Sequence, residues 1–162
     1  MQLLTSLIDG ILIGFVYGVA AVGLTLIWGV MSVINLSHGP VMALGMFSTY
    51  LLFTNLGVNP SLALLGVAVF GLVLGLVIYT VAVHRVISAP HLSSLLATFA
   101  VNMIIIGIGT AVFSTSPHNI DYSLGSLYLG TIILPATRLL AAVAARAFTV
   151  LLSLFLYFTR PG

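Results

Sequence analysis

The chain has 162 residues, of which 61% are hydrophobic and only 4% are charged, and its mean hydropathy is +1.32. Soluble domains carry about 25% charged residues, so this composition excludes a soluble globular protein and indicates an integral membrane protein. The net charge of +2 is too small and too dispersed to favour nucleic-acid binding. The absence of cysteine excludes disulfides, thiolate catalysis and cysteine metal sites.

Hydrophobic segments follow one another along the chain. Segment 11–34 contains no charge and exceeds the roughly 20 residues that a bilayer requires. Segment 41–56 is shorter, and is equally consistent with a marginal crossing and with a re-entrant helix. Three further spans are expected at 62–83, 92–114 and 139–158, the last interrupted by Arg146. The sequence therefore predicts an all-α, polytopic membrane protein with about five hydrophobic helices.

Polar connections separate these segments. Residues 55–60 contain glycine, asparagine and proline and predict a turn. Residues 84–91 form a short polar connection. Residues 115–135 are longer and of mixed composition, and we expect them to form an external loop that lies on the membrane surface.

A group of polar and helix-breaking residues follows the first segment: Asn35, Ser37, His38, Gly39 and Pro40. Pro40 lacks an amide hydrogen and disfavours the α conformation at Gly39, so we expect the first helix to end near Gly39. Gly39 would then make the turn, and Pro40 would take the first position of a new helix, capped by Ser37 or His38. A broken helix at membrane depth is tolerated only where it is buried in protein or lines a watery cavity. This break is therefore the leading candidate for a functional site.

The fourth segment presents a second polar face. Ser94, Thr98, Asn102 and Gly109 recur at helical spacing, and Asn102 falls near the middle of the membrane. An asparagine at that depth requires a partner or water. An interhelical hydrogen bond is the simpler interpretation, and a place on a transport path is the alternative.

Small residues form stripes at steps of three or four along the first and third segments. The members that we expect to pack against neighbouring helices are Gly10, Gly14, Gly18, Thr25, Gly29, Gly71 and Gly75. Small residues allow close helix approach in lipid. The stripes therefore predict a multi-helix bundle and carry no information about a substrate.

His38 is the one titratable residue at the break. A metal-binding role is poorly supported, because the other histidines (His84, His91 and His118) lie in connections without ligand spacing to it. A proton-carrying role is chemically reasonable, and a brace for the broken backbone is the most economical interpretation. Catalytic triads, phosphate loops and carboxylate pairs are not found in the sequence, so we expect neither an enzyme nor a bound cofactor.

Arginine positions suggest how the chain crosses the membrane. Arg85 and Arg160 are separated by two spans, so both are expected on the cytoplasmic face, with Tyr79 at the same interface. Arg138 argues weakly against this assignment. If segment 41–56 crosses fully, the N-terminus is external, which is the arrangement we favour; if it is re-entrant, the N-terminus is cytoplasmic.

The stretch from Gly10 to Gly39 resembles the opening of LivH-type permeases of branched-chain amino acid ABC transporters. The resemblance rests on the glycine-spaced helix, on Trp28-Gly29, and on Ile34-Asn35-Leu36-Ser37-His38-Gly39. The stretch from Leu95 to Ile105 and the ending L-F-L-Y-F-T-R-P-G are similar to later parts of the same family. Pro40 departs from the small or acidic residue that is usual in the family after His-Gly.

This resemblance implies a permease of the bacterial inner membrane that pairs with a second permease subunit. Two cytoplasmic ATPase subunits would hydrolyse the ATP, and a periplasmic binding protein would deliver leucine, isoleucine or valine. Relatives that carry urea or short amides are an alternative within the family, and a non-transporting membrane assembly subunit is an alternative outside it. Because the chain ends where the ATPase-coupling loop is expected, residues 1–162 are expected to be a partial permease domain, its N-terminal part.

Overall fold

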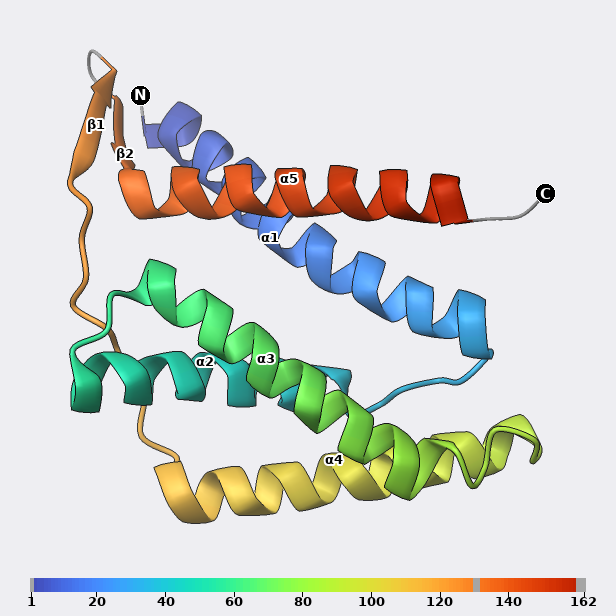
Figure 1. Ribbon diagram of the computed structural model, residues 1–162. Coiled ribbons are helices and arrows are strands. Elements are labelled where there is room, and N and C mark those ends of the chain that lie inside the picture. The colour runs from blue at the N-terminus through green and yellow to red at the C-terminus, as the bar shows by residue number, and fades with distance from the viewer. Residues whose placement is uncertain (1, 130–131, 160–162) are drawn as a thin grey trace. The chain divides into compact units, whose positions relative to one another are not determined.

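The protein is described by a computed structural model that covers residues 2–129 and 132–159 (Figure 1). Within them the chain is mostly helical, which confirms the predicted fold class. The helices are α1 (Gln2–Met31), α2 (His38–Leu56), α3 (Pro60–Ile78), α4 (His91–Phe113) and α5 (Ala136–Thr159), with a π-helical turn, η1 (Tyr79–Val83), continuing α3. By length and composition, α1, α3 with η1, α4 and α5 can each cross a membrane. α2, for which the sequence left a full crossing and a re-entrant helix open, is not among these four.

A small β-hairpin lies in the second half of the connection that is expected to be external. β1 (Ser126–Leu129) and β2 (Ile132–Pro135) pair antiparallel, with Leu127 opposite Leu134. The connection predicted over 115–135 thus contains a hairpin that the sequence analysis did not anticipate, and its external position stays a prediction. Apart from Ser126 and Pro135, which lie opposite each other at the open end of the hairpin, both strands consist of aliphatic and aromatic residues. Such residues suit a pleated strand, and runs this short are no signal for a membrane helix.

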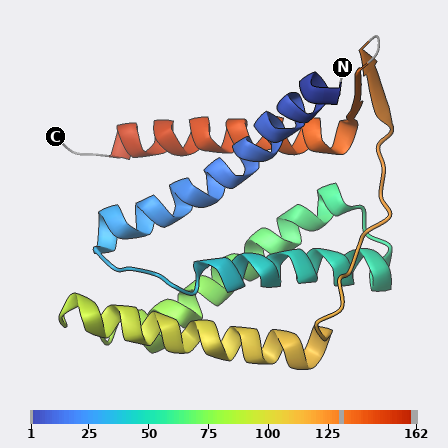
Figure 2. The same cartoon turned by 180° about the vertical axis from the view of Figure 1, so that it is seen from behind.

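Tertiary contacts divide the chain into two compact units, one formed by Ile27–Asp121 and the other by Met1–Leu26 together with Tyr122–Gly162. In the first unit α2 and α3 form an antiparallel helical hairpin (Figures 1 and 2). Gly57, with φ of +62°, ends α2, and the Asn59 side chain accepts a hydrogen bond from the Ser61 amide at 3.1 Å to begin α3. The predicted turn at 55–60 is confirmed.

In the second unit, α1 and α5 run parallel. Asp9 pairs with Arg138, Leu12 shares a buried apolar cluster with Ala142, and the Arg146 guanidinium lies 5.5 Å from the centre of the Phe15 ring. These contacts advance in the same direction along both helices. The two helices therefore begin at the same side of the membrane.

This parallel pair favours one of the two predicted topologies. α4 is a single candidate span between Arg85 and the start of α5, so a cytoplasmic Arg85 puts the start of α5 outside the cell. The N-terminus is then external too, and α2 must cross. With 19 residues, α2 is about 28 Å long, close to the roughly 30 Å hydrocarbon core. Arg160, on which the prediction also relied, lies outside the described residues.

Thiol labelling checks this topology. With cysteine at position 2, 88 or 119 of the cysteine-free chain, an impermeant maleimide should label positions 2 and 119 in intact cells. Position 88 should react only after the cells are permeabilised. Labelling of 119 together with protection of position 2 would instead support a re-entrant α2, and labelling of 88 in intact cells would reverse the whole assignment.

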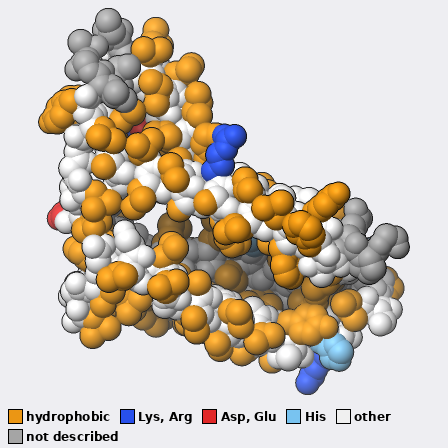
Figure 3. Space-filling model, turned by 45° about the horizontal axis from the view of Figure 1, so that its top comes forward, with side chains coloured by type: hydrophobic (Ala, Val, Ile, Leu, Met, Phe, Trp, Pro, Cys, Tyr) orange, Lys and Arg blue, Asp and Glu red, His pale blue; other side chains and the backbone are white. Residues whose placement is uncertain are grey.

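Large hydrophobic side chains are exposed along every helix, and Figure 3 shows them spread over the visible face with charged groups only at isolated points. Few side chains are fully buried, and these include the polar pair Ser37 and Thr98. An apolar exterior is the surface that a bilayer or further membrane helices would cover. The buried polar residues mark the position of the candidate site.

Candidate functional site

The first helix ends earlier than predicted. α1 stops at Met31, and Ser32 takes a φ of +52°, while its amide donates to the Trp28 carbonyl at 2.8 Å. Residues 32–37, called the break segment below, then run without helical structure to His38. The break itself is thus present, but the left-handed turn lies at Ser32. The prediction that Gly39 makes the turn is wrong, because Gly39 is already inside α2.

Pro40 occupies the third position of α2, so its predicted placement at the first position is also wrong. The proline is accommodated because amides in the first turn of a helix have no carbonyl partner within that helix. Ser37 is the residue that precedes α2, but its side chain does not cap the helix, contrary to one of the two predicted caps. The first amide of α2 that bonds back is that of Val41, which donates to the Ser37 carbonyl at 3.0 Å.

Asn35 folds the end of the break segment into a tight turn. Its Oδ1 atom accepts hydrogen bonds from both the amide, at 3.0 Å, and the hydroxyl of Ser37. This is an asparagine side chain imitating a backbone turn, and the Ser37 hydroxyl donates to it without accepting from a first-turn amide of α2. Within the described residues no acceptor meets the Nδ2 group of Asn35, so its two N–H donors remain available.

Thr98 of α4 forms hydrogen bonds to the backbone of the break segment. The Thr98 hydroxyl donates to the Ile34 carbonyl at 2.8 Å and accepts from the Leu36 amide at 3.3 Å. It also lies 3.0 Å from the Ser94 carbonyl, one turn earlier in α4. Thr98 is completely buried. The helix-free backbone on either side of Asn35 therefore depends on one hydroxyl more than sixty residues away.

A cavity of about 220 Å³ lies beside the break segment. Asn35 and His38 supply polar groups at one side, and Tyr79, the first residue of η1, supplies a third. The remaining lining is apolar or glycine: Ile27, Met31, Val33, Val41, Gly75, Ile78 and Val83. The cavity thus combines hydrogen-bond donors at the break with aliphatic walls, the usual composition of a small-molecule site.

The π-helical turn forms part of this cavity. In η1 the His84 amide reaches back five residues to the Tyr79 carbonyl at 2.7 Å, and π-turns of this kind are frequent at functional sites. Sequence reasoning assigned Tyr79 to the membrane interface and missed the cavity. Its position near the end of an apolar run gives no local signal for that role.

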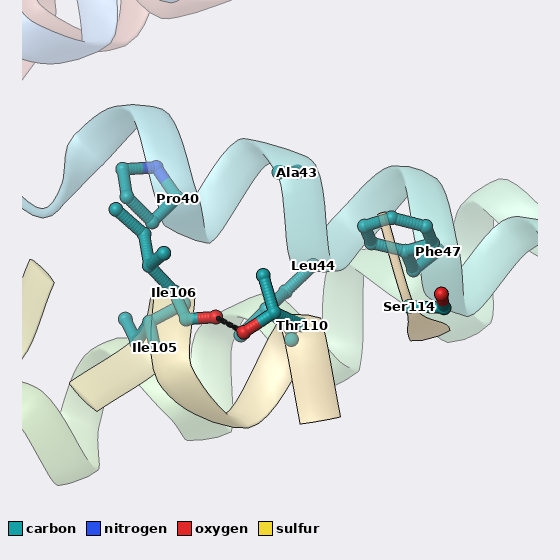
Figure 4. Close-up of a pocket in the computed structure, with 9 residues that line it drawn as sticks. Pro40, Ala43, Leu44, Phe47, Ile105, Ile106, Thr110 and Ser114 are labelled. Carbon is teal, nitrogen blue, oxygen red and sulfur yellow. Dashed lines mark hydrogen bonds between the residues drawn. The ribbon is translucent and has the colours of Figure 1, made fainter. Parts of the chain in front are cut away.

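A second cavity, of about 170 Å³, lies between α2 and α4 (Figure 4). Figure 4 shows Pro40 and Phe47 of α2 facing Ile106 and Thr110 of α4. The Thr110 hydroxyl is already bonded to the Ile106 carbonyl at 2.8 Å. This cavity is nearly all apolar and lacks the available amide donors of the first, so we regard it as a packing groove.

The other predicted residues, apart from Gly75, lie away from the cavity at the break. Asn102 is half-buried, its amide bonds to none of the described residues, and it does not line the cavity at the break. Its role stays a prediction.

Among the predicted packing glycines, Gly75 lines the cavity at the break. The others face open space, because a Cβ atom built on any of them would meet nothing within 4 Å: Gly10, Gly14, Gly18, Gly29 and Gly71. Thr25 bonds to the Ala21 carbonyl of its own helix.

Comparison with known proteins gives a consistent result. The model of a family described as "Branched-chain amino acid transport system / permease component" matches residues 6–162. The chain is 26% identical over 140 residues to the high-affinity branched-chain amino acid transport system permease protein LivH of Salmonella typhimurium, and equally to that of Salmonella typhi.

Each of these matches covers 80% of this chain but only 44% of the relative, so the chain spans less than half the length of these curated relatives. No solved structure matches it significantly. The family match extends through all five helices and includes the break segment. The chain therefore belongs to the family of branched-chain amino acid transport system permease components, which are transporter subunits of the bacterial inner membrane and not enzymes.

Proposed function

We propose that the chain forms part of the translocation path of an ABC importer for branched-chain amino acids, and that the cavity at the break segment lies on this path. The observation that carries the proposal is that Asn35, whose Nδ2 group meets no acceptor among the described residues, lines a cavity that is mostly aliphatic and that has His38 and Tyr79 as its other polar members. The N-terminus of α2 is a second argument for the proposal. Gly39 lies in the first turn of α2, where amides lack a partner within the helix, and a helix N-terminus favours negative charge. An amino acid carboxylate would meet these donors, and a branched side chain would meet Val33, Val41 and Ile78.

The partners are proposed from the family. An importer of this kind requires a second permease subunit, two ATPase subunits and a periplasmic binding protein. We propose that the chain is the N-terminal part of a permease, as the resemblance of residues 10–39 to the opening of such permeases implies. Because the chain matches only 44% of its relatives' length, we propose that further helices complete the path. It binds no cofactor in this scheme, since ATP is hydrolysed by the partners.

Two alternatives differ in what they require of the cavity. A permease for urea or short amides belongs to the same family in our sequence analysis, but urea has no apolar part to match the aliphatic walls. A non-transporting assembly subunit requires no cavity donors, and the open glycine faces of α1 and α3 are compatible with it. The available Asn35 donors favour transport over assembly, and the aliphatic walls favour branched-chain amino acids over urea.

Uptake into membrane vesicles tests the proposal. The chain is co-expressed with candidate ATPase and binding-protein genes, with and without the polypeptide that supplies the missing permease half. Labelled leucine should accumulate only with ATP and only when both halves are present, and excess valine should compete whereas urea should not.

Three results would contradict this account. Accumulation without the second half would show that the chain is not a partial permease. Competition by urea or acetamide equal to that by valine would move the substrate to the short amides. Failure to accumulate any of these solutes, with every subunit present at normal levels, would support the assembly subunit.

A further inference from the structure

Arg146 lies at mid-depth in a candidate membrane span. It is ten residues beyond Ala136, the first residue of the 24-residue helix α5, which corresponds to about 15 Å along a helix of about 36 Å. Arg138, in contrast, lies within one turn of the helix start. An ionisable residue deep in a span is rare and commonly marks a functional contact.

The described residues only partly accommodate this charge. The Arg146 side chain is exposed, and its guanidinium lies against the Phe15 ring of α1 at 5.5 Å. One turn earlier on the same face, Ala142 is buried beside Leu12. Arg146 therefore sits at the margin of the α1–α5 contact, with a cation–π contact on one side and nothing polar from the described chain on the other.

This chain has no carboxylate to offer Arg146. It contains only two acidic residues, Asp9 and Asp121. Asp9 is already paired with Arg138, which is the one ion pair among the described residues, and Asp121 lies outside the helices, between α4 and β1. A second copy of the chain would bring the same two residues in the same places, so it has no mid-depth carboxylate either.

We propose that Arg146 is the docking point for a transmembrane helix outside these 162 residues that carries an aspartate or glutamate at mid-depth. A guanidinium binds a carboxylate through two parallel hydrogen bonds. Thr149 and Ser153 lie on the same face, and their hydroxyls are satisfied by the carbonyls of Ala145 and Thr149 at 2.9 and 2.8 Å. On the side of Arg146 that carries Thr149 and Ser153 the face thus has short, internally bonded side chains, which allow a second helix to approach closely.

Lipid phosphate is a poorer occupant for geometric reasons. Phosphates lie outside the roughly 30 Å hydrocarbon core, whereas the backbone of Arg146 lies near the middle of α5. The proposal extends the proposed function, since it names the chemistry of a helix that would complete the permease. It can nevertheless be tested without any transport component.

The test uses the full chain, labelled with an energy-transfer acceptor, in phosphatidylcholine vesicles. The probes are synthetic 20-residue leucine–alanine helices that carry a donor label and have glutamate, glutamine or leucine at the central position. We expect the glutamate helix to bind about tenfold more tightly than the leucine helix, with the glutamine helix between them. Arg146→Leu and Arg146→Gln should abolish the preference, and Arg146→Lys should keep part of it. Arg85→Leu, which removes an arginine outside the spans, is the matched control and should change nothing.

Other outcomes would overturn the proposal. Equal binding of all three helices is the result expected if Arg146 reaches lipid phosphate. Energy transfer between copies of the chain that Arg146→Leu removes would assign the face to self-association. Either result leaves leucine accumulation by the complete importer intact, whereas failure of that accumulation would contradict the proposed function and not this contact.

Discussion

Replacing Thr98 with valine should lower leucine uptake by the assembled importer at least tenfold. Valine has nearly the shape of threonine but cannot bond to the Ile34 carbonyl or the Leu36 amide, which Thr98 joins at 2.8 and 3.3 Å. Each buried backbone group left unsatisfied costs about 1–3 kcal/mol, so the break segment would be released or rearranged. Thr98→Ser keeps the hydroxyl and should retain most of the uptake.

Thr110→Val is the matched control for this substitution. Thr110 lies on the same helix and also bonds to a carbonyl one turn back, but it is exposed and touches no part of the break segment. Initial rates of labelled leucine uptake, corrected for the amount of chain in the membrane, should therefore fall for Thr98→Val and not for Thr110→Val. Equal rates for the two variants would show that the break segment does not depend on Thr98.

The membrane helices were predictable because each depends on local sequence. A bilayer selects long apolar runs whatever their neighbours are, and segments 62–83 and 92–114 reappear nearly unchanged as α3 with η1 and as α4. Their ends were harder to predict. α1 ends at Met31, several residues before Gly39, because Ser32 adopts a left-handed conformation. A serine gives no sequence signal for that conformation.

The contacts between distant residues were not predictable from local patterns. Thr98 was selected as a polar residue on one face of its helix, but nothing in that pattern indicates its bond to the break segment, which spans 64 positions. The pairing of Asp9 with Arg138 spans 129 positions, and sequence reasoning treated Arg138 only as a weak argument about topology. The structure supplies what the pattern lacks, which is the relative direction of α1 and α5.

At the candidate site, too, the residues were predictable from local sequence and their contacts were not. Asn35 and His38 were predicted because polar residues interrupt an apolar run, and both line the cavity. The different roles of the two ends of the Asn35 amide could not be predicted from the sequence, because they depend on which atom of the amide faces Ser37. In the structure Oδ1 holds the turn and Nδ2 is left available.

The two ends of the Asn35 amide can be separated by substitution. Asn35→Leu removes both the turn and the donors, and should lower uptake at least tenfold without preventing insertion, because the flanking helices remain apolar. Asn35→Asp keeps an oxygen for the Ser37 amide and hydroxyl but replaces the donors with a negative charge. If Nδ2 faces the substrate carboxylate, as we propose, aspartate should repel the substrate while preserving the turn. His38→Ala should also reduce uptake, since His38 lines the same cavity.

The initial rate of leucine uptake by the Asn35→Asp complex is the most direct measurement of whether the break segment lies on the substrate path. It is made at saturating binding protein and compared with the wild-type rate at equal amounts of chain in the membrane. Our account predicts a rate at least tenfold below wild type, as low as that of Asn35→Leu. A wild-type rate for Asn35→Asp, with Asn35→Leu inactive, would show that Asn35 only holds a turn and would contradict a contact with the substrate.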